Sequence, residues 1–310
     1  MTTSLKPLRV IAFPGAPNLP IFAAIEHGDF AAAGVGVALT TTPSSVFQFE
    51  KFAAGEFDIA MSAYDNIVAY AEGQGAAKVR AGFDPCVIAG ATQLELSLIT
   101  APEVKTYADL KGRTLALDAL ATGFAFVLYE MLSAGGLSPD DCKMVPVGAT
   151  PNRWQSVKEG VHAGTLAIEP FTSIARASGF NVLDVSSRHF PSYQGGVISA
   201  SRAWAHANAD SVRGYLRGYL AGLAWTLAPA NRDAASALLL SKMPEIKPGV
   251  APAVMNSLLS PKSGLTPSAA ILPDGMKTVL DLRSRHAPAK KQLADIEKYL
   301  ELSYYDEVAR

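Results

Sequence analysis

The chain has 310 residues, which is enough for about two domains. Hydrophobic residues make up 49% and charged residues 18% of the sequence, a composition that excludes a disordered chain and provides a packed core. The 27 basic and 28 acidic side chains give a formal net charge of −1, without a long basic run, and no apolar run reaches the roughly 18 residues of a membrane span, so neither a nucleic-acid partner nor a transmembrane protein is expected.

The first unit of the chain runs from Leu8 to Gly34. Residues 10–13 are apolar and predict a strand, residues 14–18 are rich in Pro and Gly and predict a turn, and a helix with apolar residues on one face follows. A strand that leads into a helix through a glycine turn directs backbone N–H groups at whatever lies beyond the end of the strand. We therefore expect this unit to form one wall of a ligand cleft.

Further strand–turn–helix units follow along the chain. We expect strands at 36–40, 58–62, 113–118, 144–147, 165–169, 181–185 and 197–200, a longer β-prone run at 87–100, and helices at 46–54, 65–71, 123–134, 153–162 and 171–178. From Asp210 onward the pattern is mostly helical, and we expect these helices to pack against the first part of the chain.

The two series of units line up with each other. Val37 aligns with Met144, and Asp58 with Thr165, at one common offset and without a gap between the two pairs. Each half can therefore build a small parallel sheet. We predict an α/β fold of two Rossmann-like lobes: lobe I is formed by residues 1–92 plus 196–310, and lobe II by residues 93–195. Crossovers near 92–96 and 192–196 would serve as a hinge beside an interlobe cleft.

The two cysteines fall in different predicted lobes, so we expect no disulfide between Cys86 and Cys142. The five histidines share no metal-ligand spacing. We expect no metal, no cofactor and no catalytic residue.

The candidate ligand-binding residues of lobe I lie at the turns after its strands. Gly15 lets the backbone approach a ligand, and Asn18 either binds a ligand or caps the next helix. Ser44 and Ser45 either cap the helix at 46–54 or bind an anion at its first turn. The lobe I candidates are Gly15, Ala16, Asn18, Ser44, Ser45, Ser62, Tyr64, Asp65 and Thr92, with Tyr64 as an aromatic wall and Asp65 alternatively as a helix cap.

The candidates of lobe II occupy the corresponding turns. Asp118 suits a ligand amine. Arg153 is the only basic residue in these turns and suits a carboxylate or sulfonate, with a solvent-exposed arginine as the alternative. Glu169 either binds a cationic group or pairs with Arg153. The lobe II candidates are Asp118, Thr122, Gly123, Phe124, Arg153, Glu169 and Tyr193.

Three stretches resemble a known family: Leu19–Gly34, Phe52–Ala60 and Ala167–Phe171. They are similar to type 2 periplasmic binding proteins, and in particular to the sulfonate/nitrate/taurine and THI5-like (thiamine pyrimidine precursor) group of ABC-transporter substrate-binding proteins. The resemblance covers residues 8–230. It implies a periplasmic, monomeric, two-lobed Venus-flytrap that captures a small-molecule ligand and delivers it to an ABC permease in the membrane.

The chain departs from this family in one visible way. The amino-terminal segment MTTSLKPLRV lacks the apolar core of roughly 7–15 residues that marks a signal peptide. Either a signal was removed and Met1 added, or the protein stays in the cytoplasm. The THI5-like pyrimidine synthases, which resemble the same fold, carry a cysteine-rich motif that does not occur here, and this argues against that enzyme activity.

Two classes of function fit these observations. The first is a binding protein for a small organic solute, aromatic or heteroaromatic or an organic anion. Aromatic or heteroaromatic character is favoured because Tyr and Phe are frequent and cations scarce at the cleft turns. The second is an enzyme on the same fold, a decarboxylase or a cofactor-pathway lyase acting on a small carboxylated substrate, which would need Asp65, Asp118 or Glu169 as an acid or base. No HExxH, P-loop, CxxC or GxSxG motif occurs, and we expect the binding protein.

Overall fold

The strands form two five-stranded sheets that share one plan, in a computed structural model that describes residues 7–309. The amino-terminal residues discussed above as a missing signal peptide lie mostly outside this range. Sheet A has the order β2-β1-β3-β10-β4 and sheet B the order β7-β6-β8-β5-β9. The strands of sheet A are β1 (Pro7–Ala12), β2 (Gly36–Thr41), β3 (Ile59–Ala63), β4 (Pro85–Thr92) and β10 (Gly196–Ser201). Those of sheet B are β5 (Ser97–Thr100), β6 (Thr114–Leu117), β7 (Lys143–Pro146), β8 (Gly164–Ala167) and β9 (Asn181–Val185).

Each sheet contains the predicted small parallel part, β2-β1-β3 in sheet A and β7-β6-β8 in sheet B, and one reversed strand that the prediction did not include. In sheet A, β10 runs antiparallel to β3 and β4, and in sheet B, β5 runs antiparallel to β8 and β9. The physical reason is the double crossover, because each reversed strand enters its sheet directly from the other lobe. The β-prone run at 87–100 is accordingly two strands, β4 and β5, that belong to different sheets.

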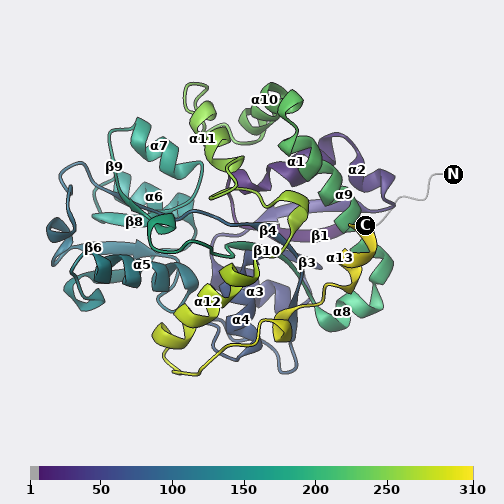
Figure 1. The fold of residues 1–310 in the computed structure, drawn as a ribbon, viewed down its shortest axis with the longest axis horizontal. Coiled ribbons are helices and arrows are strands. Elements are labelled where there is room, and N and C mark those ends of the chain that lie inside the picture. Colours follow the sequence, from purple (N-terminus) through teal and green to yellow (C-terminus); the bar gives the residue numbers. More distant parts are fainter. Residues whose placement is uncertain (1–6, 310) are drawn as a thin grey trace.

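Helices flank both sheets (Figure 1). Around sheet A lie α1 (Leu19–Glu26), α2 (Asp29–Ala32), α3 (Ser45–Ala53), α4 (Tyr64–Ala71), α8 (Arg202–Ala207), α9 (Ala209–Leu227), α10 (Arg232–Lys242), α11 (Ala251–Leu258) and α13 (Ser303–Val308). Around sheet B lie α5 (Gly123–Ala134), α6 (Thr150–Lys158) and α7 (Phe171–Ala177). The predicted two-lobed α/β fold is confirmed, whereas the exact lobe boundaries stay predictions.

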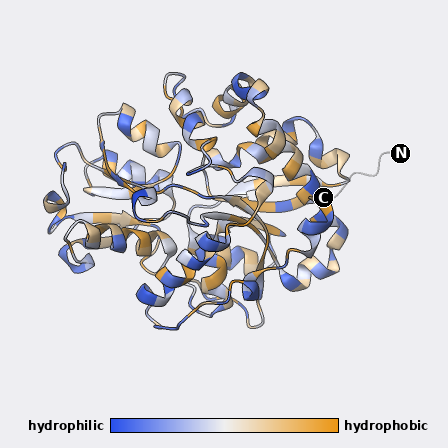
Figure 2. Cartoon of the chain, viewed as in Figure 1, coloured by the Kyte–Doolittle hydropathy of each residue, from blue (hydrophilic) through white to orange (hydrophobic). Residues whose placement is uncertain are grey.

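Apolar residues gather in the strands and on the helix sides that face them (Figure 2). The long helix α9 packs closely on α1 and α2 because glycines lie at the contact. A Cβ atom on Gly222 would lie 2.2 Å from the backbone oxygen of Pro20, and one on Gly218 would lie 2.3 Å from a ring carbon of Phe30. Glycine is therefore required for this approach of the helices.

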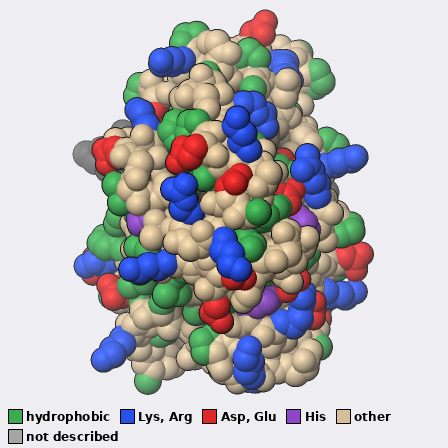
Figure 3. Space-filling view, turned by 90° about the vertical axis from the view of Figure 1, so that its left-hand side faces the viewer, with side chains coloured by type: hydrophobic (Ala, Val, Ile, Leu, Met, Phe, Trp, Pro, Cys, Tyr) green, Lys and Arg blue, Asp and Glu red, His purple; other side chains and the backbone are tan. Residues whose placement is uncertain are grey.

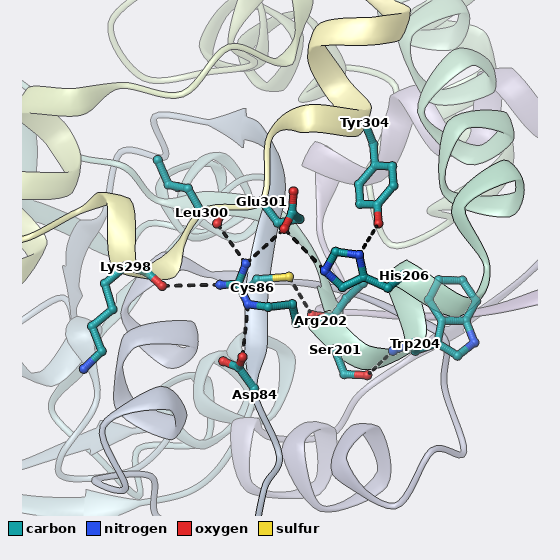
Figure 4. Close-up of polar contacts among 11 residues, drawn as sticks. Asp84, Cys86, Ser201, Arg202, Trp204, His206, Lys298, Leu300, Glu301 and Tyr304 are labelled. Carbon is teal, nitrogen blue, oxygen red and sulfur yellow. Dashed lines mark hydrogen bonds and ion pairs between the residues drawn. The ribbon is translucent and has the colours of Figure 1, made fainter.

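The end of the chain is fastened to lobe I by Arg202 (Figure 4). Its guanidinium donates to Asp84 at 3.0 Å, to the backbone oxygen of Leu300 at 3.2 Å and to Glu301 at 3.1 Å. The carboxylate of Glu301 also lies 3.7 Å from His206. The segment that carries α13 is consequently held against β4 and α8.

One carboxy-terminal helix departs from the expectation that all of them pack on lobe I. Helix α12 (Pro273–His286) contacts both α4 of lobe I and α5 of lobe II. On the lobe II side, Arg285 donates to Glu130 of α5 at 2.6 Å. Figure 1 shows α12 beside both helices, below the junction of the lobes.

The surface carries both signs of charge. On the end of the molecule seen in Figure 3, basic and acidic side chains are interspersed. Within residues 7–309, no helix combines the length and apolar character that crossing a bilayer requires.

Candidate functional site

A cavity of about 90 Å³ lies between the lobes, where β1, β3, β6 and β8 end. Its walls come from turns that follow strands of both sheets and from both crossovers, as expected for ligand sites at the carboxyl ends of strands. The lining residues are Phe13, Pro17, Asn18, Met61, Ser62, Ala63, Asn66, Ala91, Thr92, Leu94, Asp118, Thr122, Gly123, Phe124, Thr150, Arg153, Ile168, Gly195, Gly196 and Val197.

About half of the residues proposed from the sequence line this cavity. They are Asn18, Ser62, Thr92, Asp118, Thr122, Gly123, Phe124 and Arg153. The others, which are not among its lining residues, are Gly15, Ala16, Ser44, Ser45, Tyr64, Asp65, Glu169 and Tyr193. For the residues that line the cavity and for those that do not, contact with a ligand stays a prediction.

The side chain of Arg153 is buried beside the cavity, with 2% of its surface exposed, so it is not the solvent-exposed arginine considered above. Its guanidinium donates only to neutral oxygens: Thr165 Oγ1 at 3.0 Å, Gly148 O at 2.8 Å, Thr150 Oγ1 at 2.9 Å and Leu166 O at 3.0 Å. These four bonds leave one of the five guanidinium N–H groups for a ligand.

Arg153 keeps its charge at neutral pH despite this burial. Burial lowers the pKa of Arg153 to about 10, although the negative charge of Asp118 acts in the opposite direction. The ring of Phe124 lies 5.9 Å from the guanidinium carbon and covers it from lobe II. Within residues 7–309 no carboxylate forms an ion pair with Arg153, and Glu169 bonds to Ser173 instead, at 2.9 Å.

Asp118 reaches across the cleft from the end of β6. Both carboxylate oxygens accept from the backbone N–H of Ser45 in lobe I at 3.2 Å. This places a negative charge at the amino terminus of α3, where the helix dipole favours it. Ser44 caps the same helix, because its hydroxyl accepts from the backbone N–H of Phe47 at 3.1 Å. The structure thus gives both serines roles in holding α3 and Asp118.

The lobe I wall carries a chain of amide and hydroxyl groups. Asn66 donates to Ser62 at 3.2 Å, and Ser62 donates to the buried side chain of Gln48 at 2.7 Å. Asn18 donates one amide N–H to the backbone oxygen of Phe13 at 2.8 Å, so its second N–H and its carbonyl oxygen remain for a ligand. Gln48, which fixes this wall, and Asn66 were not proposed from the sequence.

The backbone of the two lobes is in direct contact around the cavity, so the structure shows a closed form. Ala16 N–H donates to Glu169 O at 3.1 Å, and Ala149 N–H donates to Pro43 O at 2.8 Å. Gly15 is part of the same contact, because a Cβ on it would lie 3.2 Å from Glu169 O. Gly15, Ala16 and Glu169 therefore join the lobes with backbone atoms beside the cavity.

Three aromatic and acidic candidates are buried away from the cavity lining. Tyr64 packs edge-on against Tyr299, with ring centroids 6.1 Å apart. Asp65 is 1% exposed and bonds to Arg283, and Tyr193 is buried next to them. Burial raises the pKa of Tyr64 and of Tyr193.

The comparisons with known proteins agree with this geometry. A family model described as NMT1/THI5 like matches residues 17–232. The chain belongs to the NMT1/THI5-like family. No curated protein sequence matches it.

Solved structures with the same fold accompany this family assignment. A protein from Bordetella bronchiseptica RB50 is 21% identical and has a TM-score of 0.80, with 99% of this chain and 98% of that chain covered. The alkanesulfonate-binding protein SsuA from Xanthomonas axonopodis pv. citri, solved bound to MOPS, is 17% identical with a TM-score of 0.74, covering 96% and 99%.

The periplasmic nitrate-binding protein NrtA from Synechocystis PCC 6803 is 14% identical with a TM-score of 0.68, covering 76% of this chain and 66% of that chain. These likenesses confirm the periplasmic binding protein fold. Together with the family match, they also confirm the predicted resemblance to the sulfonate, nitrate and THI5-like group.

Proposed function

We propose that this chain is the solute-binding component of an ABC-type importer and that it captures a small organic anion by closure of its two lobes. The NMT1/THI5-like family supports a solute-binding role, and SsuA, described as alkanesulfonate-binding, has the same fold. The proposal includes a periplasmic location, a permease partner and the absence of catalysis.

The buried cation Arg153 is the observation that carries the anionic part of the proposal. A charge that is removed from water is normally paired, because an unpaired buried charge costs several kcal/mol. The guanidinium of Arg153 is 2% exposed and bonds only to neutral oxygens. An acidic group of the ligand would supply the missing partner through the remaining N–H group.

The other lining residues support an organic body of modest size. Side chains without polar atoms cover much of the cavity, among them Phe13, Leu94, Phe124, Ile168 and Val197. The cavity of about 90 Å³ in this closed form is smaller than the ~150 Å³ apolar cavity that accepts benzene, so a compact ligand or a slightly wider closure is required. The proposal is that a flat aromatic or heteroaromatic acid lies between Phe124 and the apolar wall once the lobes part slightly.

A thermal-shift screen of the purified protein tests this function. The panel contains alkanesulfonates, aromatic sulfonates and carboxylates, pyrimidines, nitrate and sulfate, each organic acid being paired with its neutral amide. We expect stabilisation by organic acids and not by their amides. Stabilisation by inorganic anions alone would overturn the organic part of the proposal, and equal stabilisation by the amides would overturn the anionic part.

Mass spectrometry of the best stabilising compound, after prolonged incubation with the protein, tests the absence of catalysis. We expect the compound to be recovered unchanged. Conversion that is lost in Asp118→Asn would instead identify an enzyme with Asp118 as its acid or base, because Asp118 is the one carboxylate that lines the described cavity.

A further inference from the structure

A buried ion pair lies where the two lobes and α12 meet. Asp65, at the start of α4 in lobe I, accepts two parallel hydrogen bonds from Arg283 of α12, each 2.7 Å long. Both side chains are 1% exposed. Arg283 also donates to Gln74 of lobe I at 3.1 Å, and this second contact fixes its orientation.

The same two side chains bind the backbone of lobe II. The backbone N–H of Gly123, in the first turn of α5, donates to Asp65 Oδ2 at 2.6 Å. Arg283 donates to the backbone oxygen of Ala121 at 3.2 Å, and its guanidinium carbon lies 5.1 Å from the centre of the Phe126 ring. One carboxylate and one guanidinium thus each bond to both sides of the junction.

We propose that Asp65, Arg283 and the N–H group of Gly123 form an interlobe clasp that sets the balance between the closed and open forms. In the closed form the Gly123 N–H group and the Ala121 carbonyl group complete the hydrogen bonds of a buried ion pair. Opening separates lobe II from Asp65 and Arg283 and exposes the pair to water. The clasp therefore stabilises closure independently of the ligand.

The position of Arg283 in the chain supports this assignment. It lies beyond residues 17–232, which the family model matches, so the clasp depends on a segment outside that match. Arg283 is held to lobe I by Asp65 and Gln74, and the chain after α12 is fastened to lobe I where Lys291 and Lys298 pair with Glu72 and, further on, through Arg202, as Figure 4 shows. If lobe II swings away while Arg283 stays with lobe I, the bonds from Arg285 and His286 to Glu130 of lobe II break together with the clasp. Asp65 and Tyr193, which the sequence analysis proposed as ligand residues, both lie at this junction.

The clasp has a consequence for ligand capture. This consequence, unlike the clasp itself, rests on the proposed function. A ligand can shift the balance only by its different affinity for the two forms. If the closed form is already favoured, the ligand needs less binding free energy to hold it, but entry requires opening of the clasp. Asp65 and Arg283 are then positioning residues for capture, without touching the solute.

Gly123→Ala tests the clasp in the full chain without any ligand. A Cβ atom at this position would lie 2.6 Å from Asp65 Cβ, across the junction, and 3.1 Å from the hydroxyl of Tyr193. The clash is relieved by opening, so we expect the closed-to-open ratio to fall about tenfold or more. Small-angle X-ray scattering would then show a larger radius of gyration than the wild type. Gly249→Ala is the matched control, because a Cβ there meets nothing within 4 Å.

Arg283→Lys tests the ion pair separately. Lysine keeps the charge but cannot form the paired hydrogen bonds to Asp65, so the same expansion is expected. Urea unfolding establishes that each variant retains a cooperative fold. If Arg283→Lys fails to fold, Gly123→Ala decides alone, because it leaves the ion pair in place.

Two results would overturn the clasp. The first is a Gly123→Ala variant with the radius of gyration of the wild type and of Gly249→Ala. The second is a folded Arg283→Lys variant that stays as closed as the wild type while Gly123→Ala expands. Because scattering is measured without ligand, a failed ligand screen would count against the proposed function and leave this test unaffected.

Discussion

Replacement of Arg153 by methionine removes the buried positive charge while keeping a long apolar side chain beside Phe124. Burial lowers the pKa of Arg153 from its ordinary 12.5 to about 10. A pKa difference of one corresponds to about 1.4 kcal/mol, so burial penalises the cation by about 3 kcal/mol in the empty protein. An anion that pairs with the guanidinium recovers free energy of this order.

The expected effect on affinity follows from this penalty. Each 1.4 kcal/mol changes Kd about tenfold, so Arg153→Met is expected to weaken binding of the anion by about 100-fold. Arg153→Lys keeps the charge but loses the planar fork, and we expect an intermediate Kd. Isothermal titration calorimetry with the best stabilising acid of the screen measures both variants.

The control is Arg176→Met, which removes an exposed charge from α7 in the same lobe. A melting temperature would mix two effects, because loss of Arg153 also leaves the carbonyl groups of Gly148 and Leu166 without this donor. Affinity at a temperature where both proteins are folded separates them. We expect Arg153→Met to bind about 100-fold more weakly than Arg176→Met. If the two Kd values differ by no more than about threefold, Arg153 does not pair with the anion.

Substitutions at three further positions test other parts of the structure. Burial raises the pKa of Glu169 to about 7, so the folded form holds this proton more tightly than the unfolded chain. The free energy of unfolding, measured with urea at several pH values, should therefore fall by at most about 3 kcal/mol between pH 4.5 and pH 7. This pH dependence should vanish in Glu169→Gln. Gly222→Ala forces a Cβ atom to within 2.2 Å of the Pro20 oxygen and should cost roughly 1–3 kcal/mol or more in urea unfolding; an unchanged midpoint would contradict the close packing of α9 on α1. Ser44→Ala removes the acceptor for Phe47 N–H and should cost about 1 kcal/mol, measured as a lower melting temperature, whereas Ser44→Asp should largely retain the cap.

The repeated strand–turn–helix pattern was sufficient to predict two lobes, because alternation of apolar residues and glycine turns is a local signal. The sequence indicated strands where β5 and β10 lie, but not that they run antiparallel, because nothing in their apolar residues distinguishes a reversed strand. Strand direction follows from the crossovers, which are a property of the whole chain. The two predicted crossovers could have suggested that one strand in each sheet runs in the opposite direction.

The candidate site was predicted best where a residue follows a strand directly. Asp118, the residue after β6, lines the cavity, whereas Arg153 reaches it from the first turn and a half of α6. Asp65 does not line the cavity, because it lies at the start of α4 and bonds to Arg283 of α12, more than two hundred residues later in the sequence; its contact with a ligand stays a prediction. A contact between such distant residues leaves no local signal, and Gln48, hidden within α3, leaves none either.

The double crossover also determines when each lobe can be completed during synthesis. All five strands of sheet B lie between residues 97 and 185, so lobe II is contiguous in the chain. Sheet A, in contrast, needs β10, which lies between β3 and β4 and is made only after lobe II. Until residue 201 has left the ribosome, β3 and β4 each expose an unpaired edge of the kind that recruits other strands. Lobe I, whose first strand is made first, is therefore completed after lobe II. A chain truncated before β10 would expose the open edges of β3 and β4 beside a lobe II that has all of its strands.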